Sequence, residues 1–177
     1  EHLVVNVREF DCVSFIECSL ALARAIKLHG MTPEDYRYQL QLLRYRGGVI
    51  DGYPSRLHYF IDWVADNEKK KAVRNISRDL GGIRDVRKVN FMSTHRPSYA
   101  QLARDDVNDK IMQTEHRLNL MQRYFIPKEK VAAHLAMIHS GDIIGVTTSI
   151  AGLDCSHTGM AAEDNNGMKF LHAPLTG

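Results

Sequence analysis

The sequence has few of the features that mark disulfide-rich, membrane-spanning or nucleic-acid-binding proteins. It contains only 3 cysteines, and an odd count leaves at least one thiol free or paired with another chain. No apolar run reaches the roughly 20 residues that a helix needs to cross a bilayer. Lys and Arg number 23 against 21 Asp and Glu, so the formal net charge is only +2. These shortages exclude a disulfide scaffold and a membrane span in this segment, and they argue against nucleic acid as a partner.

The length and composition fit one globular domain with one sizeable core. The chain has 177 residues, of which 44% are hydrophobic, and we therefore predict a single domain over residues 1–177. It opens at Glu1 inside sequence typical of ordered structure and stops at Gly177 just after a strand-like segment. We expect both ends to be trimmed, so the missing export signal does not point to the cytoplasm.

Helical patterns fill the first two-thirds of the sequence and strand patterns the last fifth. We predict helices over residues 12–29, 33–46, 55–64, 97–123 and 127–140, and strands over 142–147, from 156 onward and 168–172. Residues 74–94 show little periodicity and are predicted as loop. Helices followed by antiparallel strands predict an α+β domain.

A cysteine stands at the start of the most apolar helical segment. Asp11 is a favourable N-cap, and apolar residues fill most positions from Cys12 to His29, which predicts a helix at the centre of the domain. The unpaired N–H groups and positive dipole end of a helix favour a thiolate there. Cys18, further along, is interpreted as a core residue, and lies roughly 9 Å along the axis from Cys12, too far for a disulfide. Cys12 is thus a candidate nucleophile, although an isolated cysteine on an apolar helix is more often a core residue.

Two of the nine histidines lie on neighbouring predicted strands. His157 is near the start of one strand and His172 near the end of the next. Such a pair can hold a base and its orienting partner face to face, since the second imidazole can fix the tautomer of the first. The pattern alone does not select these two from the other histidines.

The alternation of side chains along paired strands predicts how His157 and His172 lie relative to each other. A loop over residues 164–167 sets His172 opposite Gly159 and makes His157 its diagonal neighbour, within reach of a hydrogen bond. A two-residue turn at 166–167 would instead place the two histidines four positions apart, which is too far. We therefore predict the longer loop, with Gly159 leaving room for the His172 ring.

Four segments, taken in order, resemble the motifs of a known family. They are FDCVSFIE, HSGDIIGVTT, SHTGMA and MKFLHA, and the middle of the chain adds RYRGG, GYPSRLHYFIDWVADN and NFMSTH. The sequence resembles the N-acetylmuramoyl-L-alanine amidase-like family of the NlpC-type, papain-like cell-wall cysteine hydrolases over nearly its whole length. The resemblance implies a papain-like fold in which a helical N-terminal part, with the nucleophile at the start of a central helix, packs on a C-terminal antiparallel sheet.

The resemblance also implies a reaction and a site. Cys12 would be the nucleophile, His157 the general base and His172 the orienting residue. The amide between the lactyl group of N-acetylmuramic acid and L-Ala would be hydrolysed through an acyl-enzyme, with no metal or organic cofactor. The substrate would be peptidoglycan or a muropeptide, and the protein would be exported to the periplasm or cell envelope. The sequence departs from the commoner NlpC pattern at residues 13–15, where many members have small residues, and it has no tyrosine before Cys12.

Further residues are candidates for substrate binding. A guanidinium can bind a carboxylate and an aromatic ring can stack on a sugar, while polar residues beside the nucleophile and base can bind peptide groups. These candidates are Asp11, Tyr53, Arg56 and Ser156, with Trp63 a further aromatic. A helix cap and an aromatic core face would explain the same residues structurally.

Three other functions remain open at this point. A zinc site could use Cys155, His157 and His172, with Cys12 as a further ligand, but no CxxC or HExxH spacing supports it. A non-catalytic peptidoglycan-binding protein could share the fold. A murein-peptide endopeptidase could use the same nucleophile and base.

Overall fold

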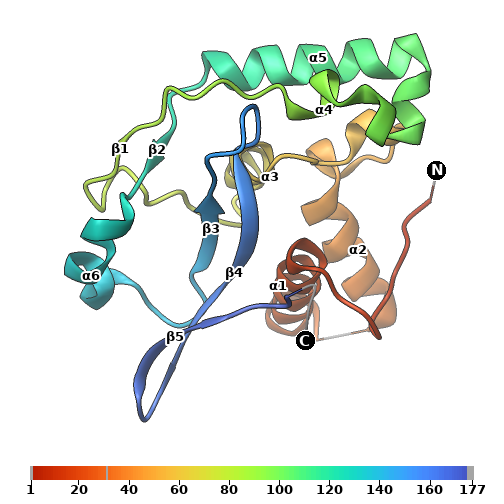
Figure 1. The fold of residues 1–177 in the computed structure, drawn as a ribbon. Helices are drawn as coiled ribbons and strands as arrows, with labels where there is room; N and C mark the ends of the chain where they lie inside the picture. Colours follow the sequence, from red (N-terminus) through yellow and green to blue (C-terminus); the bar gives the residue numbers. More distant parts are fainter. Residues whose placement is uncertain (1, 31, 175–177) are drawn as a thin grey trace.

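The computed structural model describes residues 2–30 and 32–174, and its helices precede its main sheet as predicted (Figure 1). The helices are α1 (Cys12–His29), α2 (Pro33–Arg44), α3 (Phe60–Lys69), α4 (Phe91–Thr94), α5 (Asp105–Leu120) and α6 (Val131–His134). The strands are β1 (Ile83–Arg84), β2 (Tyr124–Phe125), β3 (Ile143–Thr147), β4 (Cys155–Asp164) and β5 (Gly167–Leu171). The α+β prediction is confirmed. None of the helices in these two ranges is long and apolar enough for a membrane span.

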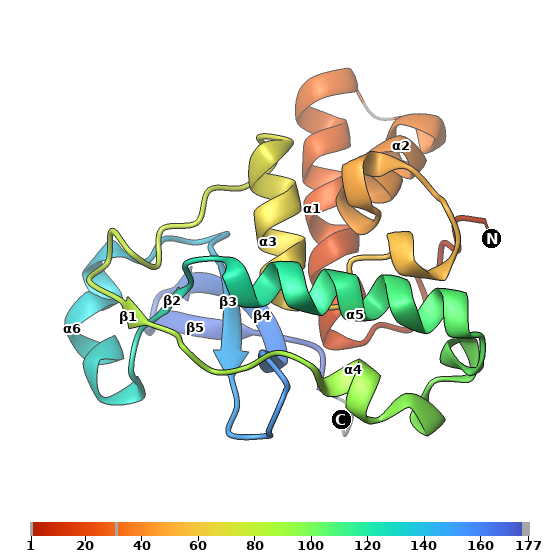
Figure 2. The same ribbon diagram turned by 90° about the horizontal axis from the view of Figure 1, so that it is seen from above.

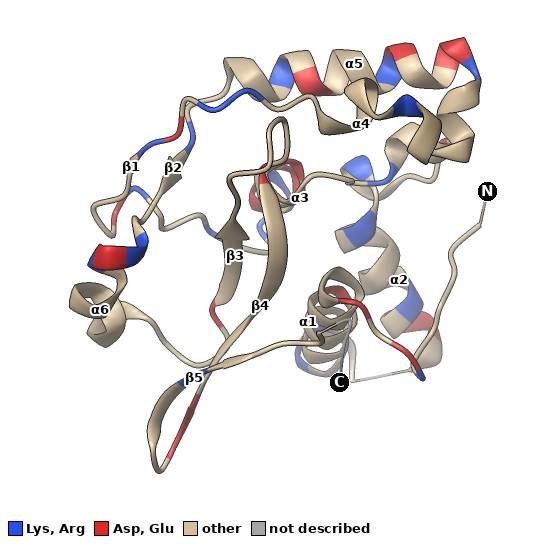
Figure 3. Ribbon diagram, viewed as in Figure 1, with Lys and Arg blue, Asp and Glu red and all other residues tan. Residues whose placement is uncertain are grey.

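The strands form two antiparallel sheets. The larger has the order β3-β4-β5, and the smaller pairs β1 with β2. In both views the chain that leaves β5 runs past β4 to the first turn of α1 (Figures 1 and 2). Lys, Arg, Asp and Glu are concentrated on the helices and around β1 and β2, whereas β3 and most of β4 carry none (Figure 3). The start of α1 thus meets a part of the sheet that is almost free of charged side chains.

Helix α1 begins and ends where the sequence predicted. The Asp11 carboxylate accepts the Ser14 backbone N–H at 2.6 Å, while the Ser14 hydroxyl accepts the Asp11 N–H at 2.9 Å, which completes a capping box. Gly30 ends the helix with φ of +80°, a conformation that glycine adopts without strain.

The expectation that α1 would be surrounded by the core is wrong. Leu22, Ile26 and Leu28 are 39–54% exposed, because the opposite face alone packs against the rest of the domain. That inner face carries small residues and also a fully buried acid, Glu17.

Helix α3 starts at Phe60, five residues later than the start predicted at Ser55. The Ser55 hydroxyl instead donates to the carbonyl of Gly52 at 2.7 Å and holds a preceding 3₁₀ turn. The first turn of α3 is satisfied by a distant residue, since the Asp154 carboxylate accepts the Ile61 N–H at 2.8 Å.

The predicted helices over residues 97–123 and 127–140 are shorter than expected. The Arg96 side chain donates to the carbonyls of Leu102 and Ala103, and this segment folds into 3₁₀ turns before α5 begins. Past Pro127 a single turn, α6, lies between two 3₁₀ turns. The predicted loop over 74–94 contains β1 and α4, which are too short to give a periodic pattern.

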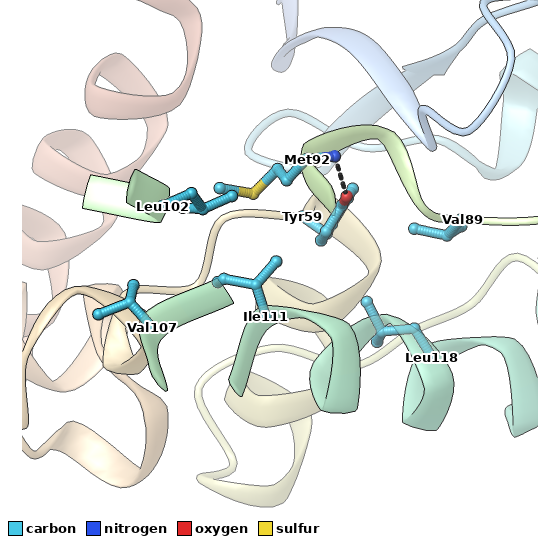
Figure 4. Close-up of a cluster of buried hydrophobic side chains, with 7 residues drawn as sticks. All are labelled: Tyr59, Val89, Met92, Leu102, Val107, Ile111 and Leu118. Atoms are coloured by element: carbon cyan, nitrogen blue, oxygen red, sulfur yellow. Dashed lines mark hydrogen bonds between the residues drawn. The ribbon is translucent and has the colours of Figure 1, made fainter. Parts of the chain in front are cut away.

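Two clusters of buried apolar side chains make up the core. One joins α4 and α5 to the segment before α3 and consists of Tyr59, Val89, Met92, Leu102, Val107, Ile111 and Leu118 (Figure 4). The Tyr59 hydroxyl accepts the Met92 N–H at 2.9 Å and donates to Glu115 at 2.7 Å. The other cluster joins α1, α2 and α3 and consists of Cys18, Ala21, Leu40, Leu43, Leu57 and Trp63. Residues 59–63 therefore connect the two clusters.

Candidate active site

The two predicted histidines meet at the hairpin of β4 and β5. His157 Nε2 and His172 Nδ1 lie 2.9 Å apart, with the rings nearly perpendicular. The register pairs Met160 with Leu171, which continues to His172 opposite Gly159. The predicted register is therefore confirmed, and the imidazoles share one face of the sheet.

The predicted loop length is wrong. Asp164 pairs with Gly167, so only Asn165 and Asn166 form the turn. The Asp164 carboxylate accepts the Asn166 N–H at 2.7 Å, and Gly167 follows with φ of +96°. The Asn-Gly pair thus does not occupy the two turn positions, because Asp164 initiates the turn one residue earlier.

Phe170 is a site residue that the sequence analysis missed. Its ring stacks on His172 with centroids 5.1 Å apart and contacts His157 edge-on at 6.0 Å. A Cβ at Gly159 would lie 2.7 Å from this ring and 2.6 Å from the Leu171 carbonyl oxygen. The room left by Gly159 therefore serves the Phe170 ring, where we expected the His172 ring. Phe170 lies two residues before His172 on the same strand, so strand alternation could have placed both side chains on one face of the sheet.

The nucleophile candidate begins α1 next to β4. Cys12 is the first residue of the helix, is partly buried and is a free cysteine. The Thr158 hydroxyl donates to the Cys12 carbonyl at 3.0 Å. This bond fixes the start of α1 against the strand position that directly follows His157, across a sequence separation of 146 residues. Thr158 was not predicted, since nothing local marks it.

Asp11 and Arg56 both lie at this end of α1. Burial raises the pKa of the Asp11 carboxyl, but the hydrogen bonds from Ser14 and the charge of Arg56 outweigh it and hold the pKa below its usual value. Both terminal nitrogens of Arg56 donate hydrogen bonds to the Glu17 carboxylate, at 3.0 and 3.1 Å. Its guanidinium is therefore engaged with the protein, although the side chain remains 26% exposed.

Cys155 does not share a face with the histidines. A shift of register between Val146 and Thr147 pairs Cys155 with Thr147, so it points to the same face as Gly145. A Cβ at Gly145 would lie 3.1 Å from the Cys155 sulfur. Burial raises the pKa of this thiol well above its usual range. Over residues 2–30 and 32–174 no three His, Cys, Asp or Glu side chains are grouped to hold a metal ion, which counts against the zinc alternative.

The other candidate contacts are scattered. Ser156 is exposed at the irregular start of β4. Tyr53 packs against the His58 ring at 4.3 Å and lines a cavity of about 230 Å³ with residues of α5. Trp63 is 2% exposed in the core, so it cannot stack on a sugar. A second cavity, of about 380 Å³, lies between the β3–β4 loop and residues 87–90. Neither cavity is lined by Cys12, His157 or His172.

Comparisons with known proteins give a consistent family. The model of the N-acetylmuramoyl-L-alanine amidase-like family matches residues 1–177. An N-acetylmuramoyl-L-alanine amidase from Bacteroides uniformis is 34% identical with a TM-score of 0.93, covering 99% of this chain and 76% of that chain. A Bacteroides fragilis protein provisionally named a xylanase is 33% identical with a TM-score of 0.91, covering 99% and 77%.

More distant comparisons add only the fold. A protein from Legionella pneumophila is 19% identical with a TM-score of 0.68 and covers 94% of this chain and 65% of that chain. No curated protein matches the sequence. On the full-length family match and the relatives above 30% identity, the chain belongs to the N-acetylmuramoyl-L-alanine amidase-like family.

Proposed function

We propose that this protein is a cysteine amidase with a papain-like, NlpC-type fold that hydrolyses the bond between N-acetylmuramic acid and L-Ala in peptidoglycan or its fragments. The observation that carries the proposal is the His157–His172 contact of 2.9 Å, together with the hydrogen bond from Thr158 of the same strand to the Cys12 carbonyl at the start of α1. Family membership and the name of the Bacteroides uniformis relative support the choice of the bond between N-acetylmuramic acid and L-Ala as the one that is cleaved. A peptidoglycan substrate would place the protein in the periplasm or cell envelope.

The two ring nitrogens of His157 take different roles in this mechanism. Nε2 faces His172, so Nδ1 is the nitrogen left for the Cys12 thiol. His157 then carries its proton on Nε2 and donates to His172 Nδ1, which leaves Nδ1 of His157 as the acceptor. His172 thereby fixes the tautomer and stabilises the imidazolium that forms during the reaction.

The reaction proceeds in two steps with Cys12 as nucleophile. His157 accepts the thiol proton while the sulfur attacks the lactyl carbonyl carbon, and the oxyanion is stabilised by the Cys12 backbone N–H at the helix start. The C–N bond breaks as His157 returns the proton to the leaving amine of L-Ala. Water, deprotonated by His157, then attacks the thioester, releases the lactyl carboxylic acid and restores the thiol.

The xylanase name of the other relative fits this site less well. Glycoside hydrolysis relies on a pair of carboxyl groups that flank the scissile bond. The proposed triad combines a thiol with two imidazoles, which is the chemistry of acyl transfer. Asp11 is the carboxylate nearest in sequence to the thiol, and it is occupied as the cap of α1.

Digestion of defined muropeptides followed by mass spectrometry tests the proposal. Release of an intact stem peptide beginning with L-Ala is expected. Cleavage within the stem peptide would instead assign an endopeptidase, and binding without any product would assign a non-catalytic peptidoglycan-binding protein.

Cysteine variants test the nucleophile. Cys12→Ala should lower activity by roughly three orders of magnitude or more, with the fold intact by circular dichroism. Cys155→Ala should remain active, because its thiol lies on the other face of β4. Alkylation at neutral pH should label Cys12 before Cys155, and rapid labelling of Cys155 with Cys12 inert would contradict the assignment.

A further inference from the structure

The cavity beside the β3–β4 loop has walls that are held together by backbone hydrogen bonds. It has a volume of about 380 Å³ and lies between residues 87–90 and residues 148–153. The Gly152 carbonyl accepts the backbone N–H groups of Asn90 and Phe91, both at 3.0 Å. A Cβ at Gly152 would lie 2.6 Å from Asn90 Oδ1, so the two segments approach as closely as only glycine allows. The cavity is therefore bounded by two segments in a fixed arrangement.

The side chains that line this cavity offer hydrogen-bond donors and no carboxylate. Lys88 is exposed and forms no hydrogen bond or ion pair within residues 2–30 and 32–174. Arg87 donates from Nε and Nη2 to Asp85, at 2.9 and 2.8 Å, and from Nη1 to the Thr148 carbonyl. A guanidinium has five N–H groups, so two of those of Arg87 are not used by the described part of the chain. The exposed hydroxyl of Ser149 adds a further donor.

A buried arginine behind Arg87 adds positive charge to this region. Arg123 is 8% exposed, and its Nη2 donates to the Arg87 carbonyl. Its Nε and Nη1 are buried without a hydrogen-bond partner among the described residues. Asp85 pairs with Arg87, and Asp154, next to the loop, turns its carboxylate to the first turn of α3. Cations therefore outnumber carboxylates here, and an anion bound in the cavity would lower the cost of burying the Arg123 charge.

The cavity is within reach of a peptide bound at the proposed base. Leu153 precedes His157 by four residues, which span at most about 14 Å. A substrate peptide of four residues in extended form spans about the same distance. In the proposed substrate the lactyl carboxyl is part of the scissile amide, so the free carboxylates belong to the stem peptide. A stem carboxylate can therefore lie in the cavity while the scissile amide lies at Cys12.

We propose that the cavity between residues 87–90 and 148–153 binds a carboxylate of the stem peptide, on the leaving-group side of the scissile amide, with Lys88 and Arg87 as the charged contacts. The inference rests on the proposed function for the identity of the peptide. It moves carboxylate binding away from Arg56, whose terminal nitrogens are both directed at Glu17.

Binding of the product peptide to the Cys12→Ala variant tests the proposal without any turnover. The probe is the synthetic stem peptide L-Ala-γ-D-Glu-L-Lys-D-Ala, titrated by NMR as the free acid and with its carboxyl groups amidated. We expect the amidated form to bind about 10-fold more weakly, because charge-assisted hydrogen bonds are lost. Equal affinity of the two forms, or no binding of the free acid up to about 10 mM, would overturn the proposal. Either result is separate from a failure of muropeptide digestion, since binding requires no hydrolysis.

Two lysine variants locate the carboxylate. Lys88→Gln should weaken binding of the free acid roughly 5- to 10-fold and leave binding of the amidated peptide nearly unchanged, as expected when the lysine and the carboxylate interact directly. Lys110→Gln is the matched control, because Lys110 is also exposed and lines the cavity beside Tyr53. It removes the same charge elsewhere and should keep the affinity within about twofold. Equal weakening by both variants would indicate attraction by net charge alone and would overturn the proposal, as would unchanged affinity in Lys88→Gln.

Discussion

Single side chains at the candidate site are held by neighbours from other elements as well as from their own strand. Phe170 fixes both imidazoles by ring contact, and Thr158 fixes the Cys12 carbonyl. None of these contacts follows from a local motif. The place of Cys12 at the start of α1 and the meeting of His157 with His172 could be predicted, whereas the contacts of Phe170 and Thr158 required the structure.

Replacing Phe170 should affect turnover more than substrate binding. In Phe170→Ala both imidazoles lose a packing surface, and His157 has more orientations available to it. We expect kcat to fall roughly 10-fold with little change in KM, because misorientation of a base acts on the chemical step. Leu171→Ala is the control, since Leu171 is 52% exposed and points to the other face of β5. A fall of equal size in both variants would refute the orienting role.

His58 should make stability depend on pH in the weakly acidic range. Burial lowers its pKa to about 4, and the neutral ring contacts the Tyr53 carbonyl at 2.9 Å. In the unfolded chain the pKa returns to about 6.5, so only the unfolded state gains a proton between these values. Stability from this group is therefore present above about pH 6.5 and decreases by up to about 3 kcal/mol as the pH falls towards 4.

His58→Gln isolates this effect. Glutamine can donate to the same carbonyl but does not titrate. Urea unfolding at several pH values should show a smaller decrease in the free energy of unfolding between pH 6.5 and 4 for the variant. Asp62 and Asp85, whose pKa values the neighbouring arginines hold low, affect stability only at lower pH. Parallel pH curves for the two proteins would rule out His58 as the cause.

At the scale of helices and strands, prediction succeeded where the signals are local. Asp11 and Gly30 flank α1 and set both of its ends. Prediction failed at the start of α3, because the carboxylate that accepts the Ile61 N–H in the first turn of this helix belongs to Asp154, 93 residues away. It failed again between residues 97 and 104, where the Arg96 side chain binds backbone carbonyls that a continuous helix would use.

The β4–β5 hairpin should be sensitive to one added methyl group. In Gly159→Ala the new Cβ would be 2.6 Å from the Leu171 carbonyl oxygen and 2.7 Å from the Phe170 ring. The strands must separate or the ring must move, at a cost of roughly 1–3 kcal/mol, and the His157–His172 contact should weaken. We expect a lower melting temperature and a loss of activity beyond that of Phe170→Ala.

A double variant separates the two clashes. Gly159→Ala combined with Phe170→Ala removes the ring, so the stability losses should be less than additive. Additive losses would mean that the Leu171 backbone alone accounts for the effect.

At the scale of the whole molecule, the two core clusters should unfold together. Residues 59–63 contribute Tyr59 to one cluster and Trp63 to the other, so neither can lose its packing without disturbing the other. Trp63 is the only tryptophan and is 2% exposed. Its fluorescence and the helical circular dichroism signal should follow the same urea transition. A tryptophan transition at lower urea would show that the α1–α3 cluster unfolds separately.

The hydrogen bond between Thr158 and Cys12 also concerns the order in which the site is completed during synthesis. A ribosome adds roughly 5–20 residues per second and releases the N-terminal part first. The candidate nucleophile Cys12 therefore emerges 146 residues before Thr158, which anchors it, on the strand that also carries the proposed base His157. Until β4 and β5 have left the exit tunnel, the growing polypeptide carries the Cys12 thiol without His157 and His172. The candidate site can therefore form only after residue 172 has left the tunnel, long after Cys12 has done so.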